Sequence, residues 1–328
     1  MASRNLQEKP AAMEAIPIDR QLGNAYQEKW ESRSSVRTRP RKWIDFSQEG
    51  YFFPEEKQPL LLRQEIMGLG QRAKEKILLQ SFLKYLNDIV SLETRLINSA
   101  CYKLIDGHSG LHYNDDIKLG AYTVLIDEHY HVYVAQDMSL QLLSQFPELG
   151  RFDYPVSDAH YAVALIRQRM EAKYHDAFEV LAVCIFETTL VRELIEFFNS
   201  ANVHPSIKYY VNDHMNDEAR HYGFFYEILT DTWKRLPDDY QEAIGSHLAD
   251  FIKQYLNVQS DKRFYADLLN RLLQDAKQSS AIVEDLYKGF EISPDIPMVK
   301  NVLSVLKKAG VLDNRHVKAG FQAMGWTL

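Results

Sequence analysis

The chain has 328 residues, and its 46% hydrophobic and 12% aromatic content is ample for one large core or two ordinary ones. Its formal net charge of −7 argues against nucleic-acid binding, which needs clustered Lys and Arg on one face. No apolar run reaches the roughly 18 residues that span a bilayer, and the polar N-terminus contains no hydrophobic signal segment. We therefore expect a globular, cytoplasmic protein that acts on small molecules or binds other proteins.

The beginning of the chain is polar and charged, with a basic patch between Arg33 and Lys42. This composition predicts that residues 1–60 form an irregular arm that wraps the body of the protein, although a solvated or partner-facing segment has the same composition. The two cysteines, Cys101 and Cys184, lie in apolar surroundings, which is typical of free thiols packed in a core.

Long proline-free intervals with apolar residues at helical spacing follow the arm, and strand signals are nearly absent. These intervals predict four long helices at about 71–105, 117–146, 158–201 and 206–235. Flanking helices are expected at about 238–257, 261–288 and 296–310. We expect an all-α protein in which residues 61–328 form a single domain, with a four-helix core over about 71–235 and flanking helices over about 238–310.

Two Glu-x-x-His motifs occur, one with Glu128 and His131 and one with Glu218 and His221. Within each motif the two side chains lie about 60° apart on one face of a helix, so both can reach one metal ion. About one such motif is expected by chance in a chain with 11 histidines. The pair is therefore informative only together with the residues that accompany it.

Two further glutamates, Glu93 and Glu187, are centred on apolar stripes of the first and third predicted helices, as Glu128 and Glu218 are on the other two. A buried carboxylate without a partner is strongly unfavourable, and no Lys or Arg occurs at the inward spacings of these helices. Two divalent ions would supply about four positive charges against the four carboxylates, and imidazoles would complete the coordination. The charge balance predicts a dinuclear metal site.

The order single Glu, Glu-x-x-His, single Glu, Glu-x-x-His is the ligand set of ferritin-like di-iron or di-manganese bundles. The gaps fit two helical hairpins, because 35 residues separate Glu93 from Glu128 and 31 separate Glu187 from Glu218, while 59 between the halves leave room for a crossover. His214 adds an imidazole about 40° from Glu218 on the same face, as a seventh ligand or as a neighbour of the ligands. Iron and manganese both suit such a site.

These residues together resemble the p-aminobenzoate N-oxygenase family of di-iron proteins, which includes the arylamine oxygenase of chloramphenicol biosynthesis. The resemblance covers about residues 60–300, and its most specific mark is the pattern His-x-x-x-Glu-x-x-His that ends at His221. It implies that His214 is a ligand, so that the implied metal ligands are Glu93, Glu128, His131, Glu187, His214, Glu218 and His221. It also implies two iron ions as cofactor, O2 as the oxidant and an external electron donor such as a ferredoxin or a reductase. The implied reaction oxidises an amine through hydroxylamine toward a nitroso or nitro product.

A substrate cavity beside the metals is expected to be lined by residues near the ligands, such as Tyr85, Ile89 and Asn202. Ordinary core packing accounts for the same three residues. A benzoate-type substrate would need an arginine in the pocket, and between residues 280 and 300 the cations are Lys288 and Lys300. The expected substrate is therefore an arylamine or another amine, such as an amino acid tethered to a carrier protein, in natural-product biosynthesis.

Other functions fit the same ligands. They are a di-iron C–H hydroxylase or desaturase, a radical-generating subunit that uses one of the 19 tyrosines, and an iron-storage protein related to ferritin. A helical scaffold without metal would leave the glutamates buried and unpaired. Symmetric dimers are the commonest soluble oligomers, so a homodimer is the expected assembly.

Overall fold

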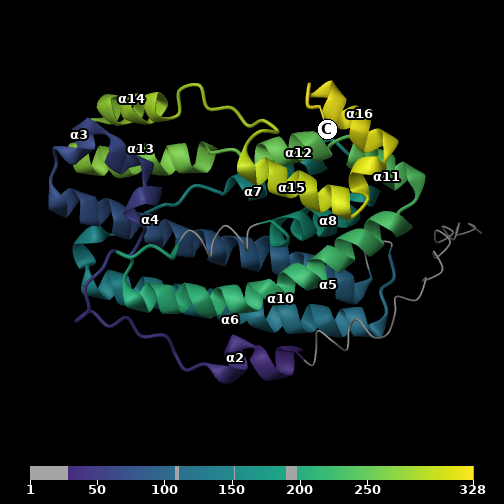
Figure 1. Ribbon diagram of the computed structural model, residues 1–328, viewed down its shortest axis with the longest axis horizontal. Helices are drawn as coiled ribbons and strands as arrows, with labels where there is room; N and C mark the ends of the chain where they lie inside the picture. The colour runs from purple at the N-terminus through teal and green to yellow at the C-terminus, as the bar shows by residue number, and fades with distance from the viewer. Residues whose placement is uncertain (1–28, 108–110, 151, 190–197, 328) are drawn as a thin grey trace, which may run out of the picture.

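The structure is a computed structural model that describes residues 29–107, 111–150, 152–189 and 198–327. The described residues form helices joined by turns, with one isolated bridge between Tyr51 and Val203. The long helices lie side by side along the molecule, and shorter helices cover them (Figure 1). Among the described residues, no helix is both long and apolar enough to cross a bilayer. The all-α fold predicted from the sequence is confirmed.

The first half of the core is a hairpin built from α4 (Gln71–Leu92), a π-helical turn (Glu93–Ile97), α5 (Asn98–Asp106) and α6 (Asp115–Gln145). The continuous first element packs against α6, as the helices expected at 71–105 and 117–146 would. Gly107 ends the first element with a φ of 66°, a conformation that favours glycine. The π-helical turn was not predicted, and turns of this kind often occur at functional sites.

The prediction of a single helix over residues 158–201 is wrong. The structure contains α7 (Asp158–Arg167) and α8 (His175–Glu187), with a short 3-10 turn between them. The sequence from Arg167 to Lys173 is mostly polar, so a continuing helix would have had no apolar stripe to bury there. Residues 190–197 of the expected helix lie outside the described residues.

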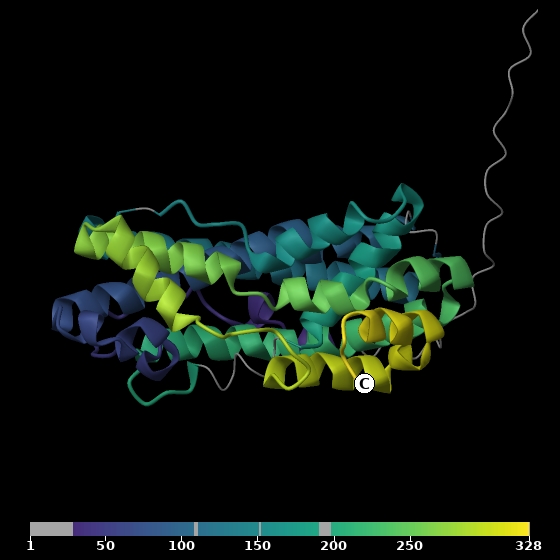
Figure 2. The same cartoon turned by 90° about the horizontal axis from the view of Figure 1, so that it is seen from above.

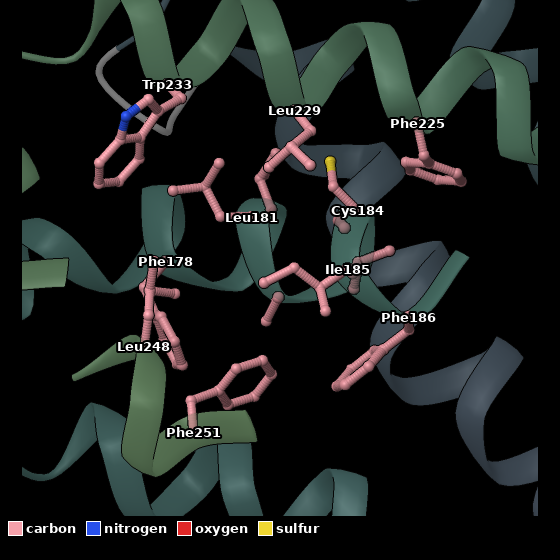
Figure 3. Packing of buried hydrophobic residues seen from close by; sticks show 14 of the residues in the cluster. Phe178, Leu181, Cys184, Ile185, Phe186, Phe225, Leu229, Trp233, Leu248 and Phe251 are labelled. Carbon is pink, nitrogen blue, oxygen red and sulfur yellow. The ribbon is translucent and has the colours of Figure 1, made fainter. Parts of the chain in front are cut away.

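In the second half of the core, α7 and α8 pack against different helices. Helix α8 packs against α10 (Pro205–Arg235), which agrees with the helix expected at 206–235, whereas α7 packs against the flanking helix α12 (Leu248–Tyr255). Figure 3 shows α8 between these two neighbours, with Leu181 and Cys184 on the side of Leu229 in α10. On the other side of α8, the Phe178 ring lies edge-on to Phe251 of α12, with 5.4 Å between the two ring centroids.

Both expected helices over 238–257 and 261–288 are divided in two, into α11 (Asp238–Gly245) and α12, and into α13 (Gln259–Leu273) and α14 (Ala276–Leu286). The second break follows from Gln274, which has a φ of 55°, and from Asp275, whose side chain caps the start of α14. At the first break, α16 packs on α12, so closely that a side chain at Gly320 would meet the Ser246 carbonyl oxygen at 2.6 Å. Helix α16 (Arg315–Ala323) was not predicted.

The remaining helices complete the cover. Helix α15 (Pro297–Lys308) agrees with the helix expected at 296–310. Figures 1 and 2 show α13 and α14 over one end of the long helices and α15 and α16 over the other. The short elements are α2 (Ser35–Thr38), α3 (Gln64–Met67) and 3-10 turns at Glu55–Lys57, Pro59–Leu62, Pro147–Leu149, Ala172–Tyr174 and Val311–Asp313.

The segment from residue 29 to residue 44 runs across α6 and α10, and α2 contacts both helices. Lys42 forms a buried ion pair with Asp213 of α10, and Arg41 pairs with Asp137 of α6. This segment, called the N-terminal strap below, lies on the side of the core opposite the C-terminal helices (Figure 1). It places several side chains directly over the ligand-bearing part of α6 and α10.

Candidate metal centre

All seven residues predicted as metal ligands lie at one place in the core. Each is at most 8% exposed, although all are polar or charged. Glu93 begins the π-helical turn, Glu187 is the last residue of α8, and the others lie on α6 and α10. The helices therefore bring together residues that are more than 120 positions apart in the sequence.

The side chains form two groups that share one carboxylate. One group consists of Glu93, His131, His214 and Glu218, and the other of Glu128, Glu187, Glu218 and His221. Within each group, one nitrogen or oxygen atom per residue lies within 4.8 Å of all the others, a spacing that suits a single ion. Glu218 belongs to both groups, so it is placed to bridge two ions.

The distances show which nitrogen atoms face the carboxylates. His131 Nδ1 lies 3.4 Å from Glu218 Oε1, and His214 Nε2 lies 3.0 Å from the same oxygen. His221 Nδ1 lies 2.9 Å from Glu128 Oε1. The two histidines of the Glu-x-x-His motifs thus present Nδ1, and the additional histidine presents Nε2.

Several of these atoms have no hydrogen-bond partner among the described residues. They are both carboxylate oxygens of Glu128, one each of Glu93 and Glu187, Nδ1 of His131 and His214, and both ring nitrogens of His221. Buried polar atoms without partners are rare because each costs about 1–3 kcal/mol. Convergent oxygen and imidazole nitrogen atoms are ligands that iron and manganese accept, so the cluster fits two metal ions.

The electrostatics of the cluster are uneven. Burial, reinforced by Glu128, raises the pKa of Glu93 to about 8. Burial, with Glu218 and Glu128, raises the pKa of Glu187 well above its usual range. Burial also opposes ionisation of Glu218, but His221, His131 and His214 outweigh it and lower the pKa of this carboxyl well below its usual range. The shared carboxylate therefore stays ionised, while the outer two hold protons readily.

Two aspartates contact the far sides of the motif histidines. Asp217 Oδ2 lies 3.1 Å from His131 Nε2, and Asp127 Oδ2 lies 3.4 Å from His221 Nε2. Each aspartate directly precedes the glutamate of one motif and faces the histidine of the other, so α6 and α10 hold each other's ligands. The hydrogen bond between Asp217 and His131 Nε2 fixes the tautomer of His131 that leaves Nδ1 as the metal-binding atom.

Arg220 joins the two aspartates. Its Nη2 lies 3.0 Å from Asp127 Oδ2 and also pairs with Asp217. Burial disfavours the ionised form of Asp217, but His131 and Arg220 outweigh it and hold its pKa well below the usual range. Both aspartates are thus kept as acceptors for the histidines.

The N-terminal strap completes this network. Trp30 Nε1 donates to Asp127 Oδ1 at 2.9 Å, and the hydroxyl of Ser34 donates to the same oxygen. The backbone N–H of Ser35 donates to Asp217 Oδ1 at 3.1 Å. Residues near the start of the chain therefore fix the carboxylates that orient the histidines.

Sequence reasoning missed Asp127, Asp217 and Arg220. A signal was present, since each motif reads Asp-Glu-x-x-His, and an aspartate next to an inward-facing glutamate is itself a candidate for burial. The contribution of Trp30 and the serines had no such signal, because it depends on where the strap crosses the bundle.

The three residues expected to line a substrate pocket occupy different places. Tyr85 is partly buried, its buried hydroxyl has no partner among the described residues, and burial of that hydroxyl together with Glu93 and Glu218 raises the pKa of Tyr85 above its usual range. Ile89 is buried one turn before Glu93. Asn202 does not join them, because its exposed side chain faces Glu55 at 3.5 Å, near the start of α10.

The fold and the cluster define a helical-bundle protein with a carboxylate and histidine site for two metal ions. A family model described as P-aminobenzoate N-oxygenase AurF matches residues 24–281, which is well over half of the chain. The chain belongs to this family, so it is an N-oxygenase of the non-haem di-iron type with a ferritin-like fold, as its motifs indicated. A comparison with curated proteins finds no match.

Replacing Asp217 by Asn is expected to weaken metal binding by about 10- to 100-fold, because His131 loses the acceptor that fixes its tautomer. Asp137→Asn is the matched control, since Asp137 likewise forms an ion pair with an arginine, Arg41, but contacts no histidine in the cluster. Anaerobic titration with Fe(II) followed by metal analysis measures the difference. Equal affinities in the two variants would contradict the role assigned to Asp217.

Metal binding is expected to release protons and to strengthen as the pH rises toward about 8, where Glu93 loses its proton. The direction follows because a ligand must be deprotonated, and raised pKa values of Glu93, Glu187 and His131 mean that protons compete with the metal at lower pH. Calorimetric titration in two buffers of different ionisation enthalpy counts the protons. The same heat in both buffers would contradict the prediction.

Proposed function

We propose that this protein binds two iron ions through Glu93, Glu128, His131, Glu187, His214, Glu218 and His221 and uses O2 to oxidise an amine. The substrate is an arylamine or another amine, free or tethered to a carrier protein, and the product is a hydroxylamine, a nitroso or a nitro compound of natural-product biosynthesis. Family membership supports the reaction class, and the third histidine in the cluster supports the ligand set.

One observation carries the proposal: His214 lies in direct contact with two carboxylates of the cluster. Its Nε2 is 3.0 Å from Glu218 Oε1 and 3.3 Å from Glu93 Oε1. A histidine that does not bind metal would instead contact the side of a ligand that faces away from the cluster, as Asp217 contacts Nε2 of His131. The position supports a site with two imidazoles in one group and a single imidazole in the other.

Bound iron would supply the redox chemistry that activates O2, and the chain supplies position and protection from water. The motif histidines are oriented by aspartates, and Glu218 holds a negative charge between the two metal positions. Tyr85 and Ile89 remain the proposed pocket residues, with the neutral Tyr85 hydroxyl available to hydrogen-bond a substrate. The first oxidation consumes one amine, one O2, two electrons and two protons, and yields one hydroxylamine and one water.

The proposal predicts that iron-loaded protein, reduced and exposed to ¹⁸O2 with a panel of aryl and alkyl amines, converts at least one amine to a product carrying ¹⁸O on nitrogen. Mass spectrometry detects the product. His214→Ala is expected to lose most of this activity, whereas His129→Ala, an exposed histidine on α6, should retain it. Oxidation at carbon, or no conversion by a protein that binds two irons, would sink the proposal.

A further inference from the structure

A basic hollow lies on the outer surface where the N-terminal strap meets α10. Its volume is about 670 Å³, and its lining includes Lys29, Arg33, Arg39 and Arg220. We propose that this basic hollow is the docking site of an acidic one-electron carrier protein, of the ferredoxin class, that reduces the metal centre. The inference rests on the proposed function, because that reaction consumes electrons.

The charge of the strap is opposite to that of the whole chain. Between residues 29 and 42 there are six cations and one acid, Glu31, whereas the chain as a whole carries −7. No Asp or Glu is among the described residues that line the hollow. Such a concentrated positive surface attracts an acidic partner.

Several of these cations are already paired within the chain. Lys42 is buried against Asp213, and Arg37 pairs with Glu31. Arg39 also reaches Asp213 but keeps a side-chain exposure of 45%. Arg33 is exposed and has no ion-pair partner within the part of the chain that the structure describes. The exposed charges are therefore spread along the strap, which suits a protein surface better than one small anion.

The hollow stands directly above the residues that hold the metal ligands. Arg220 lines the hollow and also contacts Asp127 and Asp217, which in turn face His221 and His131. Only one side chain and one carboxylate therefore separate a docked partner from each motif histidine.

An aromatic residue lies on the same route. Trp30 donates to Asp127 at 2.9 Å, and Asp127 lies 3.4 Å from His221. A narrow gap of about 10 Å³ between Trp30, Arg220 and His221 leaves room for about one water. This route of polar contacts from the strap to the cluster is short.

The electron balance requires such a partner. Each amine hydroxylation takes two electrons, and a ferredoxin gives one at a time, so two carriers would be oxidised and two bound iron ions would together receive two electrons per O2. Protons come from solvent, and no bond in the carrier changes. Exposed charges that steer a partner act mainly on the rate of association and are screened by salt.

The test uses an acidic [2Fe–2S] ferredoxin as the probe and the full chain loaded with iron. The double variant Lys29→Glu with Arg33→Glu reverses two exposed charges of the hollow. The matched control, Lys307→Glu with Lys308→Glu, makes the same change on exposed positions at the end of α15, on the opposite side of the molecule (Figure 1). Thermal unfolding and iron content verify that both variants remain folded and loaded.

Binding is measured at low and high salt, and the rate of reduction by ferredoxin is followed by stopped-flow absorbance beside reduction by dithionite. At low salt the hollow variant is expected to bind ferredoxin at least about tenfold more weakly than wild type, which corresponds to roughly 1.4 kcal/mol, and to be reduced correspondingly slowly. Its reduction by dithionite should stay within about twofold of wild type, and the control should behave as wild type in both assays.

Equal loss of ferredoxin binding in the two variants, or none in either, would overturn the docking proposal. Tight binding of inorganic phosphate that does not compete with ferredoxin would also overturn it, by assigning the hollow to small anions. Failure of the proposed function gives a different pattern, in which ferredoxin binds and reduces the protein normally but no amine is oxidised with either reductant.

Discussion

Four carboxylates buried together in one helical core are the constraint on which the rest of this structure depends. Glu93, Glu128, Glu187 and Glu218 come from four different helical elements and are at most 8% exposed. Burial, reinforced by their mutual repulsion, raises the pKa of Glu93 and Glu187, so the cluster is stable only with positive charge among them, from protons or from metal ions. The helices can therefore pack around these four carboxylates only when the negative charge of the site is compensated.

The surrounding network shows how the chain meets this constraint. Asp127 and Asp217 bind the motif histidines from behind, Arg220 neutralises the aspartates, and the N-terminal strap caps both. The histidines contact the aspartates, and the aspartates contact Arg220, which lines the basic hollow at the surface. A segment far from the ligands in sequence thus becomes part of the site, which gives the strap a structural role beside its proposed role in docking.

The features that could be predicted from the sequence are those that follow from the helical spacing of apolar residues. Glu93 and Glu187 could be recognised because a helix repeats every 3.6 residues, so apolar neighbours reveal which way a glutamate points. The break between α7 and α8 does not follow from proline positions, because no proline interrupts this interval; its signal is the polar run after Arg167. Asn202 lies at the surface beside Glu55, and its position depends on a connection that local pattern does not describe. Trp30 could not be found, since its contact with Asp127 spans 97 residues.

The most direct test of the account is anaerobic Fe(II) loading followed by elemental analysis of wild type, Glu218→Ala and Glu242→Ala. Glu218 is shared by both ligand groups, whereas Glu242 is an exposed glutamate on α11 that serves as the matched control. The account predicts about two irons per chain in wild type and in Glu242→Ala, and loss of both in Glu218→Ala. No iron in the wild type, or two irons retained without Glu218, would contradict the claim that these buried carboxylates exist to hold two metal ions.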